Sequence, residues 1–171
     1  YVFHRDGRFT VGGSGAMNDY EFRGVTPIRK HNGQIKQIII GKDITYIGKF
    51  NFNWCSKLQN VTFEDGAKLE RIGWGAFGYS SLPSITIPDS VTQIDGYAFY
   101  YCSKLTDVAI SENSKLESLG EYAFKADTKM TSLYIPDGVT KIGTAIFKDV
   151  SGVTLSVAEN SYAQAYAEKY G

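Results

Sequence analysis

An internal repeat limits the possible folds of this sequence more than any other feature. The segment SITIPDSVTQIDGYAF begins at Ser84, and the closely similar SLYIPDGVTKIGTAIF begins at Ser132, 48 residues later. That distance contains two copies of a shorter unit. Pairs of apolar residues separated by one residue recur every 22 to 25 residues: Ile38/Ile40, Val61/Phe63, Ile85/Ile87, Val108/Ile110, Leu133/Ile135 and Leu155/Val157. A period of this length predicts a solenoid of stacked coils.

Further positions follow the same period, and we call each set of equivalent residues a column. One column precedes the apolar pair: Ile35, Leu58, Leu82, Leu105 and Met130. Another follows it: Ile47, Ile72, Ile94, Leu119 and Ile142. A third is phenylalanine in five coils: Phe52, Phe77, Phe99, Phe124 and Phe147. A single coil cannot bury these side chains, but stacked coils cover one another and form a continuous core.

The local pattern of one coil predicts its secondary structure. SITIP alternates with period two and contains β-branched residues, which is typical of a strand. The PDS or PDG that follows suits a turn. GYAFYYC is too short for an independent helix, so we expect one helical or 3₁₀ turn that directs Phe99 into the core.

These residues resemble the BspA-type leucine-rich repeat, a class found mainly in surface and secreted proteins of host-associated bacteria and some protozoa. The segment LPSITIPDSVTQIDGYAFYYCSK and its relatives carry the resemblance, which extends from about Ile35 to Val157. It implies an α/β fold: a right-handed leucine-rich-repeat solenoid of about six coils, with a parallel sheet on one face and short helical turns on the other. It also implies recognition or adhesion, without catalytic residues.

We expect one domain over 1–171, with caps at both ends. Residues 1–34 lack the period, and GRFTVGGSGAM predicts a strand and a glycine-rich turn that shield the open sheet edge. Residues 35–157 are the repeats. Residues 158–171 form the C-terminal cap, where SYAQAYAEKY spaces its tyrosines and alanines as an amphipathic helix does. Asn51 replaces the alanine or isoleucine of other coils, which suggests adaptation of the terminal coil to its cap.

The composition excludes several functions. Lys plus Arg and Asp plus Glu each number 18, so no net charge favours nucleic acid or an anionic membrane. No apolar run is long enough to insert into a bilayer. The two histidines, His4 and His31, have no metal-site spacing around them, and we expect no cofactor. No nucleophile elbow or phosphate-binding glycine loop is present, so we do not expect an enzyme.

The two cysteines, Cys55 and Cys102, lie in one column with Ser80 between them. Strands of a sheet lie about 4.8 Å apart, so residues two coils apart are separated by about 10 Å. A disulfide needs Cα atoms within about 7 Å. We therefore predict two buried, unpaired thiols.

Two surfaces are candidates for binding. The first is the sheet-face column, on the outer side of the sheet, where Ile39, Thr62, Thr86 and Tyr134 would face a protein partner, as the extended faces of repeat proteins do. The second is an aromatic column, Trp54, Tyr79 and Tyr101, whose rings suit stacking on sugars or anchoring of a protein. Either surface can also be structural: the first as a solvated sheet, the second as a cover over the core.

The sequence therefore predicts a monomeric, non-catalytic recognition or adhesion module, extracellular or at a bacterial cell surface. We expect a host or bacterial surface protein as partner. The alternative is a carbohydrate-binding module that uses the aromatic column.

Overall fold

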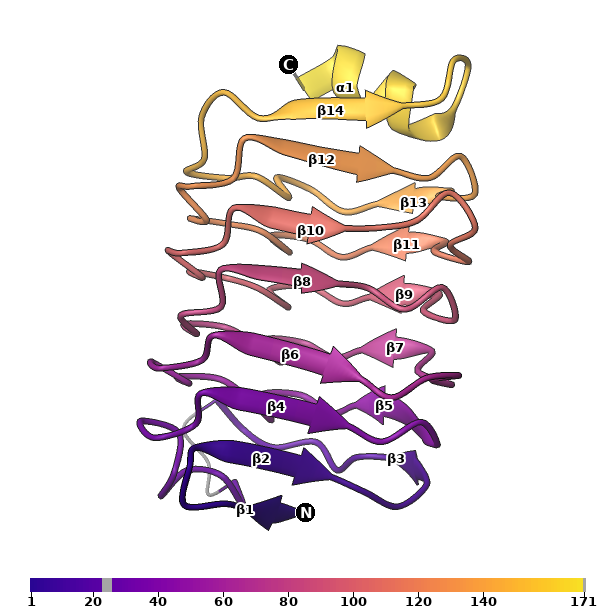
Figure 1. The fold of residues 1–171 in the computed structure, drawn as a ribbon. Coiled ribbons are helices and arrows are strands. Elements are labelled where there is room, and N and C mark those ends of the chain that lie inside the picture. The colour runs from indigo at the N-terminus through magenta and orange to yellow at the C-terminus, as the bar shows by residue number, and fades with distance from the viewer. Residues whose placement is uncertain (23–25, 171) are drawn as a thin grey trace.

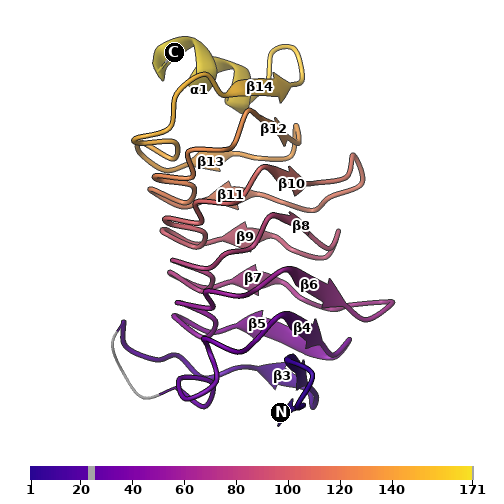
Figure 2. The ribbon, with the colours of Figure 1, turned by 60° about the vertical axis from the view of Figure 1, so that its left-hand side comes forward.

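The computed structural model describes residues 1–22 and 26–170 as a single stack of coils. The N-terminus lies at one end of the stack and the C-terminal helix at the other (Figure 1). Each full coil contributes one strand to a front face and one strand, shorter in all but the first of these coils, to a second face (Figure 2). The third side of the coil carries turns instead of strands.

The front face is formed by parallel strands that begin about one repeat apart. Ile38 of one coil lies opposite Val61 of the next, and Leu133 lies opposite Leu155, as the predicted columns require. The strands are β2 (Arg8–Val11), β4 (Gln37–Ile40), β6 (Asn60–Phe63), β8 (Ser84–Thr86), β10 (Asp107–Ala109), β12 (Ser132–Ile135) and β14 (Thr154–Val157).

The second face is one continuous parallel sheet, which the sequence analysis did not predict. Ile47, Ile72, Ile94, Leu119 and Ile142 lie opposite one another in it. Because β14 is not followed by such a strand, the solenoid has about five full turns. The strands are β3 (Gly15–Ala16), β5 (Ile44–Ile47), β7 (Arg71–Ile72), β9 (Gln93–Ile94), β11 (Ser118–Leu119) and β13 (Lys141–Ile142).

The predicted helical turns on the third side are not confirmed, because the described residues there form turns with no helical assignment. Alternate N–H groups donate across to the next coil instead. The amides of Tyr97, Phe99 and Tyr101 donate to the carbonyls of Glu121, Ala123 and Lys125 at 2.9–3.0 Å. The turn edge is therefore hydrogen-bonded from coil to coil, as the second sheet is.

The front face is divided where proline replaces an N–H donor. No pairing joins β6 to β8 or β10 to β12 among the described strands. Elsewhere Gln59 donates to the Lys36 carbonyl and Glu64 to the Ile40 carbonyl, at 2.8 and 3.0 Å. In the next coil these two positions are Pro83 and Pro88, which have no N–H to donate. Pro136, directly after β12, likewise has no N–H to donate toward the coil of β10.

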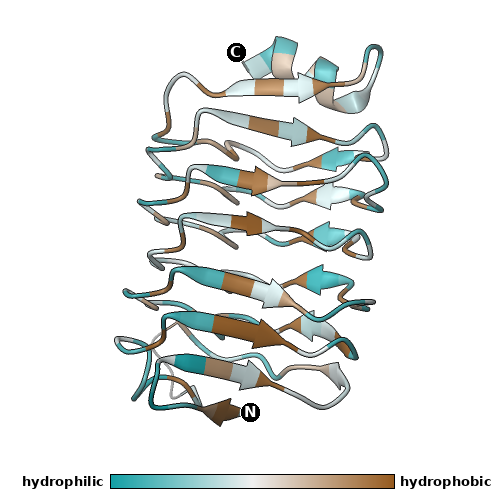
Figure 3. Ribbon diagram, viewed as in Figure 1, coloured by the Kyte–Doolittle hydropathy of each residue, from teal (hydrophilic) through white to brown (hydrophobic). Residues whose placement is uncertain are grey.

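The core is the set of columns predicted from the repeat, and hydrophobic segments recur along the strands (Figure 3). Phe52, Phe77, Phe99 and Phe124 are fully buried. With Phe147 they form a stack whose successive ring centroids lie 5.5–5.8 Å apart. Each ring excludes water from both of its neighbours, which explains why the residue does not change from coil to coil.

The N-terminal segment forms an additional partial coil. Strand β2 pairs in parallel with β4, and β3 pairs with β5. Strand β1 (Val2–Phe3) then pairs antiparallel with β2 at the outer edge. The Asn51 amide donates to the Asn18 carbonyl at 2.7 Å, and the Asn53 amide donates to the Phe22 carbonyl at 3.1 Å. These contacts explain why the first coil departs from the repeat.

The C-terminal helix α1 (Tyr162–Tyr170) lies within the range predicted for it and contacts β13 and β14. Ala163 is buried and Tyr166 packs against the core. Tyr162 and Tyr170 are exposed, so the buried face of the helix is narrower than the tyrosine spacing predicts. The handedness of the solenoid stays a prediction.

Candidate binding surface

The structure divides the predicted sheet-face column among the three parts of the front face. Ile39 and Thr62 lie directly opposite each other on β4 and β6. Thr86 belongs to the β8–β10 pair and Tyr134 to the β12–β14 pair. Tyr134 is half-buried against the core instead of projecting fully from the sheet. The four residues are therefore neighbours on one face, although they do not form one uninterrupted column.

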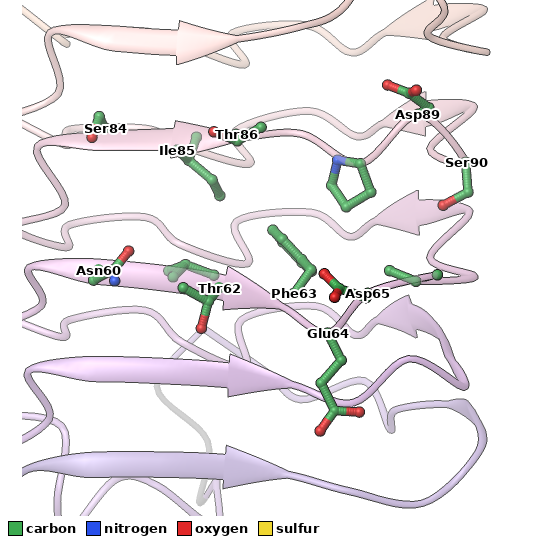
Figure 4. A pocket seen from close by; sticks show the side chains of 14 residues that line it. Asn60, Thr62, Phe63, Glu64, Asp65, Ser84, Ile85, Thr86, Asp89 and Ser90 are labelled. Atoms are coloured by element: carbon green, nitrogen blue, oxygen red, sulfur yellow. The ribbon is translucent and has the colours of Figure 1, made fainter.

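A groove of about 580 Å³ lies where β6 and β8 are unpaired (Figure 4). Its strand residues include Thr62 and Thr86, Pro88 also lines it, and Phe63 lies at the end where β6 finishes. Acidic residues surround that end: Glu64, Asp65 and Asp89. Glu64 accepts a hydrogen bond from the Lys42 amide at 3.0 Å and Asp89 accepts one from the Ser111 hydroxyl at 2.5 Å. Two of the three carboxylates are thus already held by the chain.

The aromatic column is present as a stack on the turn edge. The rings of Trp54 and Tyr79 are parallel within 3° at a centroid distance of 4.2 Å. Tyr79 and Tyr101 follow at 5.3 Å with a tilt of 35°. Trp54 is 45% exposed and Tyr101 is 50% exposed. The three predicted residues are therefore brought together on the surface.

The main chain of the turns sets the position of this stack. Trp54, Tyr79 and Tyr101 all have φ between 58° and 61°, in the left-handed region that only a few non-glycine residues adopt. Ala126 and Asp149 continue the same conformation in the next two coils. Because the conformation repeats, successive side chains leave the turn in the same direction at the spacing of the coils.

The stacking limits what the column can bind. A sugar stacks on an open aromatic face, but Trp54 and Tyr79 cover each other. Phe22 packs beside both rings, at centroid distances of 6.4 and 6.0 Å. The side of Tyr101 toward the next coil meets Ala126, which has no ring. One ring face of Trp54 and one of Tyr79 are thus closed to a sugar.

A second group of aromatic residues adjoins the column and was not predicted as a site. Phe22, Phe50, Trp74, Tyr97 and Tyr100 line a slot of about 400 Å³ together with Tyr79 and Glu121. Burial, followed by the proximity of Tyr122 and Glu121, raises the pKa of Tyr97. The signal in the sequence is GAFG at 75–78, where two glycines replace the bulky residues of neighbouring coils.

The second sheet carries a charged cluster whose contacts are internal. Asp95 is buried and stands in a column that is glycine in the other coils. The Arg71 guanidinium donates to both of its carboxylate oxygens at 2.9–3.0 Å, and the Gln93 amide donates at 2.7 Å. The carboxylate is saturated, so this cluster stabilises the fold and offers no open ligand position.

The cysteine prediction is confirmed, because Cys55 and Cys102 are free and fully buried. Burial raises the pKa of both thiols, which makes them poor nucleophiles at neutral pH. Asp127 occupies the same column in the following coil and is also fully buried. Its Oδ1 accepts the Cys102 amide at 2.6 Å, and Oδ2 has no hydrogen-bond partner. Burial raises the pKa of Asp127 to about 8, against the opposing effect of the Cys102 amide.

Within residues 1–22 and 26–170, no group of His, Cys, Asp and Glu side chains is arranged to hold a metal ion. Over the same part of the chain, no helix has the length and apolar character needed to cross a bilayer.

Short parallel strands, one repeat per coil and a buried phenylalanine stack define a leucine-rich-repeat solenoid. The chain belongs to the BspA-type leucine-rich repeat family, whose model matches residues 30–154 as six copies. Proteins of this family are generally repeat scaffolds without enzymatic activity.

Solved structures with this fold include bacterial proteins of greater length. A leucine-rich repeat protein from Eubacterium ventriosum is 28% identical with a TM-score of 0.79, over 92% of this chain and 41% of that one. The pneumococcal vaccine antigen PcpA is 24% identical with a TM-score of 0.72, over 86% of this chain and 41% of that one. A leucine rich cell surface protein from Faecalibacterium prausnitzii is 21% identical with a TM-score of 0.56, over 90% of this chain and 48% of that one.

The last two similarities show the fold alone. The chain spans less than half the length of each of these proteins. No curated protein matches the chain.

Proposed function

We propose that this chain is a non-catalytic recognition module of a bacterial cell-surface or secreted protein, and that it binds a protein partner through the solenoid surface. The observation that carries the proposal is the exposure of Phe22, Trp54 and Tyr101 in one aromatic group on the turn edge. Tryptophan and tyrosine supply much of the binding energy in protein interfaces. The descriptions of two similar structures as a cell surface protein and a vaccine antigen support the location.

The geometry of the rings favours a protein over a sugar. Because Trp54 and Tyr79 stack on each other, the aromatic column offers few open faces for a pyranose ring. Ring edges and hydroxyl groups instead suit the mixed apolar and polar contacts of a protein interface. The groove between β6 and β8 adds Thr62 and Thr86 on an adjacent face, where a large partner gains further contacts.

Carbohydrate binding is the second candidate, and one observation favours it. Tyr101 is half-exposed, and the next residue in its column is Ala126. One face of the Tyr101 ring is therefore open at the end of the stack, where a single sugar ring could lie against it.

Two sets of substitutions test the proposal. Binding of each variant is measured to immobilised host extracellular-matrix proteins and to a glycan array. The first set changes the sheet face: Ile39, Thr62, Thr86 and Tyr134 to Glu. The second removes the aromatic column: Trp54, Tyr79 and Tyr101 to Ala. We expect a matrix protein to bind, and the second set to weaken binding at least tenfold, because it removes the interface anchors.

The first set should weaken the same binding less, by placing unpaired charge in the outer interface. Melting temperatures of both sets control for loss of fold. Binding to a glycan alone, lost with Tyr101→Ala, would replace the protein proposal with the carbohydrate one. A protein ligand that tolerates both sets would place recognition on a different surface.

A further inference from the structure

The slot beside the aromatic column is enclosed by a continuous chain of aromatic contacts. Ring centroids 4.9–6.0 Å apart connect Phe50 to Phe22, Phe22 to Tyr79, Tyr79 to Tyr100, Tyr100 to Tyr97 and Tyr97 to Trp74. The angles between these rings run from 39° to 84°. Rings at such angles leave a space between them, whereas the parallel rings of Trp54 and Tyr79 leave none. We call these six residues the aromatic cage.

Among the residues that the structure describes, no side chain fills the slot, because its coil has glycine at Gly75 and Gly78. Phe50 lies over Gly75, where a Cβ would come within 2.4 Å of the Phe50 ring. At Gly78 a Cβ would meet only main-chain oxygens at 3.5 Å or more, an ordinary contact. The residues equivalent to Gly78, each directly after the core phenylalanine, are Asn53, Tyr100, Lys125 and Lys148. A side chain is thus allowed at Gly78, and none is there.

Later coils show what this position holds when it is filled. The Lys125 ammonium lies over the rings of Tyr100 and Tyr122, at 5.4 and 5.5 Å from their centroids. The Lys148 ammonium lies over Tyr122 at 5.9 Å. These distances are those of cation–π interactions, in which the negative face of the ring attracts a cation. The solenoid therefore places the ammonium of Lys125 over tyrosines of two neighbouring turns and the ammonium of Lys148 over one tyrosine.

The electrostatics of the slot favour the same occupant. Glu121 is its only charged lining residue among those that the structure describes. The face of any ring that lines the slot adds its negative electrostatic potential to that carboxylate. A cation surrounded by aromatic rings is held more strongly than one on an open surface.

We propose that the aromatic cage binds a lysine side chain of the protein partner, which takes the place that Lys125 and Lys148 occupy within later coils. The alkyl stem of the lysine packs between the rings, and its ammonium approaches Glu121. This inference rests on the proposed function in one respect, since it assigns the lysine to a protein.

The test uses the full chain and the probe acetyl-Gly-Lys-Gly-amide, followed by the NMR shift of the Trp74 indole N–H. The control probe carries Nε-acetyl-lysine, which keeps the stem and removes the charge. We expect the lysine probe to saturate the shift, with the acetylated probe binding at least about fivefold more weakly. Tetramethylammonium chloride is a third probe, which separates a lysine site from a site for small quaternary ions.

Three variants complete the test. Gly78→Lys places an ammonium in the slot from within the chain, so it should abolish binding of the lysine probe while preserving the melting temperature. Gly78→Ala is the matched control and should retain binding. Glu121→Gln should weaken the lysine probe several-fold and leave the acetylated probe unchanged. Glu117→Gln, an exposed carboxylate outside the slot, should have no effect.

Equal binding of both peptide probes would overturn the proposal, because the slot would then select apolar stems and not charge. Unchanged binding to Gly78→Lys would place the probe elsewhere and also overturn it. Binding of tetramethylammonium without the lysine probe would overturn the assignment to lysine. If the lysine probe binds but no matrix protein binds the chain, the aromatic cage is supported and the proposed function is contradicted.

Discussion

Two columns run side by side through the same turns and differ completely in their variation. The first is the core phenylalanine column, which is Phe in every coil from Phe52 to Phe147. The second begins one residue later, and we call it the outward column. Its members are Asn53, Gly78, Tyr100, Lys125 and Lys148. The two positions are adjacent in the chain, yet one is always phenylalanine and the other is amide, glycine, aromatic or basic.

The main chain explains the difference. The amides of alternate turn residues donate to the next coil, and this ladder does not depend on which side chain is present. Inside the ladder, a ring must fill the space left by the rings above and below, so its size is fixed. Outside it, a side chain meets solvent or its neighbours in the outward column. The core phenylalanine column therefore determines the fold. The outward column can vary without loss of the fold, so its residues can be adapted to a ligand.

The largest expected effect comes from breaking the core phenylalanine column. Phe99 packs against Phe77 and Phe124 at 5.5 and 5.6 Å, so Phe99→Ala leaves a cavity between two rings. We expect a loss of about 3–5 kcal/mol in the free energy of unfolding, measured by urea denaturation. Tyr134→Ala, on the half-buried sheet face, is the comparison and should cost far less. Similar losses at both sites would contradict the assignment of Phe99 to the core and of Tyr134 to the outer side of the sheet.

The cysteine column gives a second, intermediate effect, because it is buried and yet varies. Its members are Cys55, Ser80, Cys102, Asp127 and Val150. Asp127 accepts one main-chain amide, which allows a polar residue there, but its second oxygen has no partner. Burial raises its pKa to about 8, so the folded protein holds a proton that the unfolded chain releases near pH 4.

This difference fixes the sign of a pH dependence. Between about pH 4 and pH 8 the folded state binds the extra proton, so Asp127 lowers the stability of the fold as the pH rises. Asp127→Asn removes that dependence. We expect the variant to gain several kcal/mol in the free energy of unfolding over the parent at pH 8 relative to pH 4, measured by urea denaturation at both values. Parallel pH profiles of the two proteins would show that Asp127 is ionised in the fold.

The repeat allowed most of the fold to be predicted from sequence. The apolar columns, the strand register and the unpaired cysteines follow from the period, because stacking brings equivalent residues together. The C-terminal helix lies outside the repeat and follows from the helical spacing of its tyrosines and alanines. The second sheet was missed because its strands are mostly two residues long and one position per coil is buried. The turns were predicted as helical because GYAF has no pattern that reveals left-handed residues such as Tyr97.

The candidate site was predicted less completely, for a different reason. Trp54, Tyr79 and Tyr101 were found because they share a column. The cage combines several columns with Phe22, which lies outside the repeat, and no period relates these positions. Its hollow depends on two absent side chains, at Gly75 and Gly78, whose importance appears only when the surrounding rings are placed.

The smallest expected effect separates these two glycines, which lie three residues apart in one turn. Gly75 has a φ of 60°, and a Cβ there would meet the Phe50 ring. Gly78 has neither constraint. Gly78→Ala should therefore stabilise the protein by about 0.4–1 kcal/mol, because alanine restricts the unfolded chain without straining the folded one. Gly75→Ala should destabilise it, because alanine resists a positive φ and displaces the ring.

Urea denaturation of the two variants beside the parent measures both effects. Because both substitutions add one methyl group to the same turn, a change common to the unfolded chain cancels between them. The difference in sign then reports only the folded structure at each site. Destabilisation by both would show that the Gly78 position is closed by neighbouring atoms, and would remove the hollow on which the cage depends. Opposite signs would establish that the outward column accepts a side chain at Gly78 and that the open slot is a property of this sequence, not of the repeat.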